Sequence, residues 1–540
     1  MGASKLYSSE KWLFALLAAW VGFGLIGHDP WKPDEAYTFG LVYHIVQSGD
    51  WLLPTLAGEP FVEKPPLFFV TAALFAQLFG GLLPLHDAAR LASGFYVVLA
   101  LLFTGLTARE LYGPGRGFPA ALLLAGCLGY LVHAHQLITD NALLAGVALA
   151  IFGFSIAVNR PGLGGALLGT GAGIAFLSKG LLGPGMIALT AITLLAFPSW
   201  RNPAYGRSLL WAAAAFAPWA LVWPALLYRH SKELFDEWFW VNNFGRFTGS
   251  AGLGGVLDHG LYLKNLAWFA FPAIAPAAWT LWRAARGARH EFRMPGLQVP
   301  LVALVVMLAV LSTASSARTL YALPMLVPVA LLAVAAIDSL PAWVARLLER
   351  VGVWGAVLGA ALLWADWLAL ITGWPGAVAA RLQSGSPGFV PQVHALALLL
   401  AIALSIGWWL LVTRAPAGAL RMPVRWLAGI TLIWGLAATL WLPYLDHTKS
   451  YRGMIAEMKP KLPASSCVAS RNLTEPQRAM FHYFAGVVSL REGSAAARDC
   501  AVLLVHTSTS AEPPHGAEWK PVWRGTRPAD DKEWFWLFNR

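Results

Sequence analysis

Long apolar runs alternate with short polar loops over most of this chain. A helix that crosses a bilayer needs roughly 17 to 25 mainly apolar residues, and the runs of suitable length predict about thirteen such helices. They lie at residues 12–27, 90–108, 118–132, 142–158, 163–178, 181–198, 208–227, 262–282, 298–314, 319–337, 352–372, 392–413 and 425–443. The pattern therefore predicts a polytopic α-helical membrane protein.

The composition agrees with this prediction. The 540 residues are 57% hydrophobic and 12% charged, whereas a soluble domain has roughly 25% charged residues. The net charge of +11 comes from Lys and Arg scattered through short loops, a pattern typical of topology determinants. A nucleic-acid partner would require basic residues clustered on one soluble face. We therefore expect membrane lipids as partners and no nucleic acid.

The charges in the loops also predict how the chain is oriented. Lys5 and Lys11 precede the first apolar run, and no small-residue cleavage site follows it. This favours an uncleaved first span with a cytoplasmic N-terminus and an external first loop at residues 28–89. Residues 67–85 are apolar enough to span, but a span there would place the later arginines outside. We therefore expect this segment to lie along the outer leaflet.

The last part of the chain, after about Leu445, has a different composition. Charged residues, prolines and short β-like runs predict a small α/β domain at residues 446–540, on the external side of a transmembrane part at residues 1–445. In an oxidising compartment Cys467 and Cys500 could form a disulfide. Cys127 lies in an apolar run and is expected to be buried.

Several polar motifs stand out against this apolar background, above all in the first loop. Charges beside a bilayer are costly and usually mark a substrate pathway or a catalytic centre. In the predicted topology nearly all acidic residues outside the tail are external, which indicates an active outer face. The motifs are PDE at 33–35, SGDW at 48–51, EKPP at 63–66, TDN at 139–141, LSKGLLG at 177–183, FWVNNFGRF at 239–247 and STASSARTLYALPMLVP at 312–328.

In this order the motifs resemble those of the lipid A aminoarabinose transferases. These belong to the GT-C superfamily of membrane glycosyltransferases, which is related to the protein O-mannosyltransferases. The resemblance covers most of the membrane region. It implies a GT-C fold in the bacterial inner membrane and inverting transfer of a sugar from a polyprenyl (undecaprenyl) phosphate carrier to an acceptor at the periplasmic face. It implies no cofactor beyond the lipid-linked donor, and we expect a monomer.

The resemblance also implies roles for particular residues. The family's catalytic carboxylate matches Asp34, with Glu35 as the alternate, and its second acidic position matches Glu63. A carboxylate within hydrogen-bond reach can activate or orient an acceptor oxygen, and positioned cations can neutralise a departing phosphate. The expected contacts to substrate or carrier phosphate are Tyr37, Lys64, Asp140, Lys179, Arg246, His259 and Lys264.

Structural roles are the alternative for several of these residues. Asp34 and Asp140 could cap helix N-termini, and Lys64 could extend its amine to the lipid headgroups. Arg246 and Lys264 could anchor the membrane interface among aromatic residues.

A metal ion is a further alternative. His133 and His135 could join Glu63 or His259 in a metal site, because imidazole and carboxylate are competent ligands. Lys and Arg can serve the departing phosphate by themselves, so the sequence requires no divalent metal.

The chain departs from the family at positions that bear on the substrate. It has Ala36 before Tyr37 where the family has an arginine, and Asn242–Asn243 where the family has a glutamate and a histidine. Ser315, Ser316 and Arg318 replace lysines. The acceptor could therefore be lipid A or another envelope glycan or protein. A transporter of the lipid-linked sugar would show internal repeats and charges near the midplane; the sequence has no clear repeat, which favours an enzyme.

Overall fold

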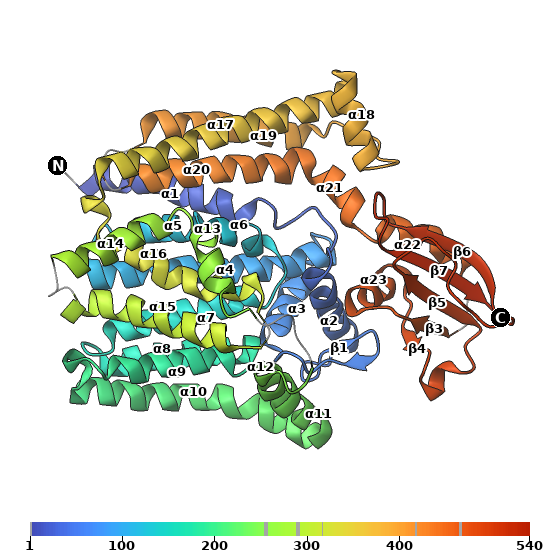
Figure 1. Ribbon diagram of the computed structural model, residues 1–540, viewed down its shortest axis with the longest axis horizontal. Coiled ribbons are helices and arrows are strands. Elements are labelled where there is room, and N and C mark those ends of the chain that lie inside the picture. The colour runs from blue at the N-terminus through green and yellow to red at the C-terminus, as the bar shows by residue number, and fades with distance from the viewer. Residues whose placement is uncertain are drawn as a thin grey trace.

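The computed structural model describes residues 3–252, 258–287, 292–315, 317–415, 418, 420–463 and 467–540, with side chains from residue 11 onward. Lys5 and Ser316, used in the sequence analysis, therefore lie outside the described side chains. A bundle of roughly parallel helices carries a small sheet domain at one end, and the two chain termini lie at opposite ends of the molecule (Figure 1).

Most of the bundle helices follow the predicted apolar segments, whereas those at residues 376–385 and 442–449 lie wholly or mostly outside them. The bundle helices are α1 (Ala3–Gly22), α4 (Leu85–Tyr112), α5 (Gly117–Ala125), α6 (Leu128–Leu131), α7 (Asp140–Ile156), α8 (Pro161–Lys179), α9 (Leu182–Leu194), α10 (Pro203–His230), α13 (Leu261–Phe269), α14 (Ile274–Arg286), α15 (Pro295–Thr313), α16 (Leu326–Ala335), α17 (Ala342–Thr372), α18 (Gly376–Gly385), α19 (Ala395–Arg414), α20 (Arg421–Leu436) and α21 (Leu442–Lys449). Short turns connect some of them: η1 (His133–His135), η2 (Pro198–Trp200), η6 (Ile337–Ser339) and the π-helix η7 (Ala437–Trp441).

Among the described residues, 7 helices are long and apolar enough to cross a membrane, or 8 with the bent pair α5 and α6. Shorter apolar helices occupy several of the remaining predicted segments. The polytopic helical fold is thus confirmed, while the total of about thirteen spans remains a prediction.

Small residues bring helices α7, α8 and α10 of the bundle close together. A Cβ added at Gly165 or Gly169 of α8 would lie 2.2 Å from a backbone oxygen of α10. A Cβ at Gly146 of α7 would lie 2.7 Å from the carbonyl oxygen of Gly171 in α8. Such close approach of backbones is typical of helix packing in membranes. It makes α7, α8 and α10 a compact support for the loops at their ends.

Shorter elements gather at the end of the bundle that faces the sheet domain (Figure 1). They are α2 (Asp34–Ser48), β1 (Thr55–Leu56), β2 (Glu59–Pro60), α3 (Leu67–Phe79), α11 (Lys232–Asp236), the π-helix η3 (Glu237–Gly245), α12 (Arg246–Thr248) and η5 (Thr319–Met325). Helix α3 is only 13 residues long and packs on α4 and α2. Its predicted position along the outer leaflet remains a prediction.

The C-terminal region forms a mixed sheet with the strand order β4-β3-β5-β7-β6. Its elements are α22 (Arg452–Met458), η8 (Lys459–Lys461), β3 (Val468–Arg471), α23 (Glu475–Ala485), β4 (Ser489–Arg491), η9 (Ala495–Ala497), β5 (Val502–Thr507), β6 (Lys520–Thr526) and β7 (Trp534–Asn539). Strands β4, β3 and β5 are parallel, and β7 runs antiparallel to β5 and β6. The region has the predicted α/β character; the domain boundary at residue 445 remains a prediction, because α21 continues past it.

The cysteine predictions are confirmed. Cys467 and Cys500 form a disulfide that joins the starts of the two neighbouring strands β3 and β5. Cys127 is free and buried.

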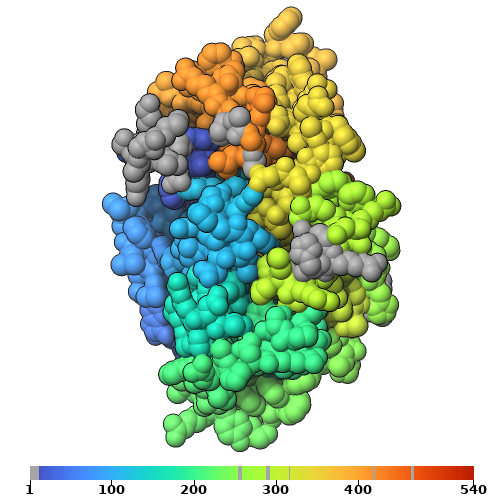
Figure 2. Space-filling view, turned by 90° about the vertical axis from the view of Figure 1, so that its left-hand side faces the viewer, coloured from blue at the N-terminus to red at the C-terminus, as the bar shows by residue number. Residues whose placement is uncertain are grey.

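Helix α23 connects this domain to the first loop by packing directly on α2. A Cβ at Gly40 of α2 would lie 2.6 Å from the Cβ of Ala479 in α23, so the two helices touch through small residues. At the end of the molecule away from the sheet, helical segments from both halves of the chain pack side by side (Figure 2).

Candidate functional site

A cavity of about 270 Å³ lies where the first loop meets α8, α9, η3 and α15. Its walls differ in character. The polar lining consists of Glu63, Lys64, Lys179, Asn242, Asn243, Arg246 and Tyr321. The apolar lining consists of Leu181, Leu182, Leu189, Phe244, Phe247, Val310, Leu311 and Ala314, with Gly185. The cavity therefore offers positive charge and an apolar wall to the same ligand.

The EKPP motif supplies one side of the polar wall. Arg246 at the start of α12 places Nη1 2.7 Å from Oε1 of Glu63. Lys64 is buried and donates a hydrogen bond to the hydroxyl of Tyr37. Its Nζ also lies 4.9 Å from the centre of that ring.

The charges around Lys64 and Glu63 keep both residues ionised. Burial alone would lower the pKa of Lys64, but Tyr37 and the carboxylates of Glu63 and Asp140 raise it above its ordinary value. Burial alone would raise the pKa of Glu63, but the hydrogen bond from Arg246 and the charge of Lys64 hold it below its ordinary value. Charged forms that are stabilised by neighbours in this way persist at neutral pH.

A second ion pair lies deeper in the bundle. Nζ of Lys179, the last residue of α8, lies 2.6 and 2.7 Å from the two carboxylate oxygens of Asp140. It also lies 4.6 Å from the ring centre of Tyr321. The carboxylate of Asp140 makes no capping hydrogen bond, since Thr139 occupies the N-cap position of α7. In the structure Asp140 therefore does not act as the N-cap of α7.

Asn243 holds the corner that follows Lys179. Its Oδ1 accepts a hydrogen bond of 2.9 Å from the amide of Leu181, and its Nδ2 donates one of 2.7 Å to the carbonyl of Trp238. Gly180 turns the chain there with φ of 76°, and a Cβ on it would lie 2.0 Å from Oδ1 of Asn243. The π-helix η3 carries Asn243, and such insertions often occur at functional sites.

Asp34 lies at the more open side of the site. It begins α2, and its side chain is 20% exposed. Oδ1 accepts a hydrogen bond of 3.3 Å from the hydroxyl of Tyr37 and lies 3.8 Å from Nη1 of Arg318. Its carboxylate does not cap the helix. Tyr37 thus contacts Asp34 and Lys64 and joins the open side to the cavity.

Glu35 points the other way, into the bundle. It is 1% exposed, and its Oε1 accepts hydrogen bonds from Nε of Arg90 at 2.9 Å and from the amide of Leu137 at 3.0 Å. Arg90 is itself fully buried and also pairs with Asp87. Through these hydrogen bonds Glu35 attaches α2 to the bundle. We therefore do not retain it as the alternate catalytic carboxylate.

The structure does not bring His259 and Lys264 into the cavity lining. The side chain of Lys264 is 70% exposed, and its Nζ lies 3.3 Å from Asp258. Nδ1 of His259 lies 2.6 Å from the carbonyl oxygen of Ser312. The described residues contain no group of three His, Cys, Asp or Glu side chains that could hold a metal ion, so the metal alternative at Glu63 and His259 is not assembled in them.

The sequence analysis did not assign roles to three residues that contribute to the site. Arg318 and Tyr321 belong to the long motif at 312–328, and Asn243 belongs to the motif at 239–247. Each of the three is a polar or aromatic residue inside a motif that matches the family, and this position in a motif could have identified it as a candidate site residue.

Three comparisons relate this chain to known proteins. The family described as dolichyl-phosphate-mannose-protein mannosyltransferase matches residues 63–237. An undecaprenyl phosphate-alpha-4-amino-4-deoxy-L-arabinose arabinosyl transferase of Pseudomonas paraeruginosa is 29% identical over 454 residues, which cover 80% of this chain and 75% of that protein. A second such transferase, from Pseudomonas fluorescens, is 28% identical over 46% of this chain and 44% of that protein.

The fold has a match among solved structures. The crystal structure of ArnT from Cupriavidus metallidurans bound to undecaprenyl phosphate superposes with a TM-score of 0.70 at 17% identity, over 99% of this chain and 98% of that one. At this identity the likeness shows the fold. Together with the family match and the relatives, it confirms the resemblance drawn from the motifs: the chain is similar in sequence to membrane glycosyltransferases and in fold to ArnT.

Proposed function

We propose that the protein transfers a sugar, with inversion, from a polyprenyl (undecaprenyl) phosphate carrier to an acceptor at the periplasmic face of the bacterial inner membrane. The observation that carries this proposal is the composition of the 270 Å³ cavity, which joins the cations of Lys64, Lys179 and Arg246 to a wall of leucine and phenylalanine. A polyprenyl phosphate has the complementary chemistry: an anionic phosphate attached to a long hydrocarbon chain. Neither a free nucleotide sugar nor a simple apolar lipid has both.

The geometry supports a single displacement. Asp34 accepts the proton of an acceptor hydroxyl, or orients an acceptor oxygen that is already ionised. The acceptor oxygen forms a bond to the anomeric carbon while the bond from that carbon to the phosphate oxygen breaks on the opposite side. The electron pair leaves with the phosphate, where Lys64 and Arg246 stabilise the developing charge. One displacement of this kind inverts the anomeric centre.

The names of the relatives indicate the substrates to test first. Both Pseudomonas proteins are named for transfer of 4-amino-4-deoxy-L-arabinose from undecaprenyl phosphate. We therefore propose an aminoarabinose-like sugar as the donor group and lipid A as the acceptor. Another envelope glycan or a protein is the alternative acceptor, because Ala36, Asn242 and Asn243 depart from the family pattern.

The distribution of charge supports the proposed orientation. Basic residues such as Arg109, Arg116, Arg160 and Arg201 flank helix ends at α4, α5, α8 and η2. The ends of α4 and α7 and the turn η2 line one cavity, far along the helices from Asp34. Basic loops favour the cytoplasmic side, and this supports the proposal that the candidate site and the C-terminal domain face the periplasm.

A reconstituted assay tests the proposal. The purified protein in liposomes would receive undecaprenyl phosphate-linked aminoarabinose and lipid A, and mass spectrometry would follow the acceptor. We expect a mass increase of one sugar with the wild-type chain and none with Asp34→Asn. If the donor crosses the bilayer but no acceptor gains mass, with lipid A or with extracted envelope glycans, the protein is a transporter and the proposal is wrong.

A further inference from the structure

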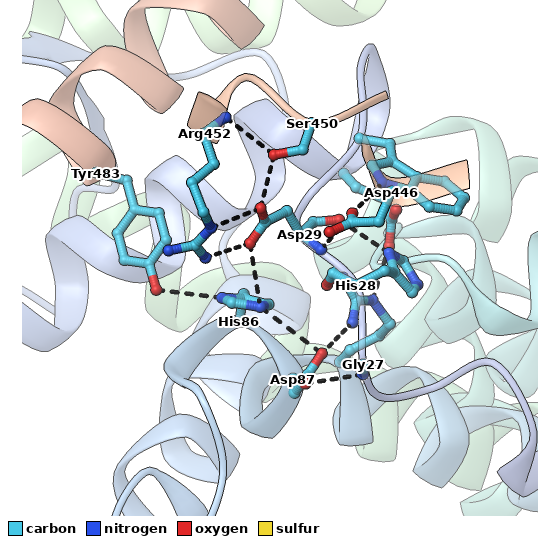
Figure 3. Close-up of polar contacts among 12 residues, drawn as sticks. Gly27, His28, Asp29, His86, Asp87, Asp446, Ser450, Arg452 and Tyr483 are labelled. Atoms are coloured by element: carbon cyan, nitrogen blue, oxygen red, sulfur yellow. Dashed lines mark hydrogen bonds and ion pairs between the residues drawn. The ribbon is translucent and has the colours of Figure 1, made fainter. Parts of the chain in front are cut away.

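The residues that immediately precede Asp34 are bound to the C-terminal part of the chain. Asp29 is buried, and its Oδ2 accepts hydrogen bonds from Nε of Arg452 at 2.9 Å and from Oγ of Ser450 at 2.6 Å. Nη2 of Arg452 contacts the other oxygen, so the guanidinium grips the carboxylate with two nitrogens. Figure 3 shows Arg452 and Ser450 both pointing at the carboxylate of Asp29.

The backbone amide of Asp29 and the side chain of Trp31 also bind the C-terminal part of the chain. The amide of Asp29 donates a hydrogen bond of 2.9 Å to Oδ1 of Asp446, and Nε1 of Trp31 donates one of 2.8 Å to the same oxygen. On the side of the bundle, Nε2 of His86 lies 3.6 Å from Oδ1 of Asp29. Asp87 accepts a hydrogen bond of 2.9 Å from the amide of Gly27 (Figure 3).

Lys32 makes a second connection two residues before Asp34. Its Nζ lies 3.0 Å from Oε2 of Glu533, the residue that precedes β7. Glu533 is buried and also accepts hydrogen bonds from Tyr451 at 2.9 Å and Gln477 at 2.6 Å. The carboxylate that receives Lys32 is therefore fixed by the domain itself.

Asp34 is left between two anchors of different origin. On its N-terminal side, Lys32 and Asp29 are bound to the C-terminal region; on its C-terminal side, Glu35 is bound to Arg90 inside the bundle. One residue spans at most about 3.6 Å of chain. The position of Asp34 is consequently determined by both parts of the molecule.

We propose that the C-terminal region is part of the catalytic apparatus, and that Arg452 is a positioning residue that acts through Asp29 to hold Asp34 in its reactive place. This inference rests on the proposed function. Arg452 touches neither the cavity nor Asp34, so its effect would be on alignment and not on donor binding. Alignment matters because a displacement of about 1 Å at a reacting group can reduce a rate on the order of 100-fold.

Arg452 is suited to substitution. Its side chain is 56% exposed, so its loss leaves the domain core, with the disulfide between Cys467 and Cys500, in place. Arg471 provides a matched control. It pairs with Glu492 within the same domain, and among the described residues its hydrogen bonds go to Glu492 and Pro514 and not to the first loop.

The experiment compares full-length Arg452→Gln, Arg452→Lys and Arg471→Gln in the transfer assay. We expect Arg452→Gln to lower kcat by about 10-fold to 100-fold with an unchanged KM for the donor. Arg452→Lys should recover part of the loss, because the charge opposite Asp29 returns without the second nitrogen. Arg471→Gln should behave as wild type. A wild-type kcat for Arg452→Gln, or an equal loss in Arg471→Gln, would overturn the inference.

Hydrogen–deuterium exchange separates this inference from the proposed function. Amides of residues 29–39 should exchange faster in Arg452→Gln than in wild type and in Arg471→Gln, because local opening becomes easier when an anchor is removed. Unchanged exchange over residues 29–39 contradicts the inference whatever the activity. Absence of transfer by the wild-type chain contradicts the proposed function and leaves the exchange comparison intact as a test of the anchor.

Discussion

The two sides of the candidate site differ in burial and in polarity. On the cavity side, Lys179 and Asp140 pair inside the bundle, Lys64 is buried, and apolar side chains continue the wall. On the other side, Asp34 and the 48% exposed Arg318 face the open surface, and the segment that precedes Asp34 is held by the C-terminal domain. The difference separates two tasks: the buried side suits a lipid phosphate that stays in the membrane, and the open side suits a polar acceptor.

Removing the carboxylate on the open side should have the largest effect. Asp34→Asn keeps the size of the side chain but cannot take a proton, and loss of a general base typically lowers a rate by about 10² to 10⁴. Donor binding should remain, because the cavity cations are untouched. Transfer rates together with binding of fluorescent undecaprenyl phosphate measure the two effects. Weaker donor binding in Asp34→Asn would contradict the assignment of the donor to the cavity side and of the acceptor to the open side.

Removing a cation on the cavity side should have the complementary effect. Arg246→Gln leaves Glu63 without its partner and takes one positive charge from the phosphate site, so donor affinity should fall by roughly 2 to 5 kcal/mol. Lys264→Gln is the matched control, because Lys264 is exposed and lies outside the cavity lining. Equal donor affinities in the two variants, measured by the same binding assay, would show that the cavity is not the phosphate site.

The corner after Lys179 gives a smaller and purely structural prediction. Gly180→Ala introduces a methyl group against Asn243 at a residue with positive φ, which should destabilise the protein by about 1 to 3 kcal/mol. Gly206→Ala is the control, since a Cβ there meets nothing within 4 Å. Thermal unfolding in detergent should show a lower Tm for the first variant only, and donor binding should weaken with it as Lys179 is displaced.

The contact of the first loop with the domain should depend weakly on pH. Hydrogen bonds from Arg491 and Arg478 lower the pKa of Glu59 from 4.5 to about 2. A carboxyl with a lowered pKa adds stability above its unfolded pKa, and the stability is lost as the pH falls from about 5 toward 2. Amide exchange of β1 and β2, expressed relative to the intrinsic exchange rate at each pH, should therefore rise in this window. Glu59→Gln should show fast exchange already at pH 7, and a pH response equal to that of the wild type would refute the assignment.

The sequence predicted the cavity side better than the open side. Lys64, Asp140, Lys179 and Arg246 lie in motifs whose order matches a family, and the structure brings these four together. Asp140 and Lys179 lie at the ends of the apolar helices α7 and α8, which the hydropathy pattern reveals directly.

The sequence could not predict the direction in which a side chain points. Nor could it predict which residues far apart in the chain form ion pairs. Neighbouring residues on a helix point about 100° apart, so no pattern distinguishes the partly exposed Asp34 from the buried Glu35. Arg90 lies within an apolar helix, and nothing local identifies its partners. Asp29 and Arg452 are separated by 423 positions, and only the packing of α23 on α2 brings their segments together.

The paired charges of the cavity have a consequence for turnover. Three cations, Lys64, Lys179 and Arg246, face two carboxylates, Glu63 and Asp140, which leaves one unit of positive charge. A sugar-linked phosphodiester carries one negative charge and makes the site neutral. After transfer the carrier is a phosphate monoester with a charge of about −1.5 to −2, and the site is overfilled with negative charge. The charge balance that favours binding of the sugar-linked carrier would thus favour release of the carrier phosphate after transfer. Its release leaves the site free for the next donor.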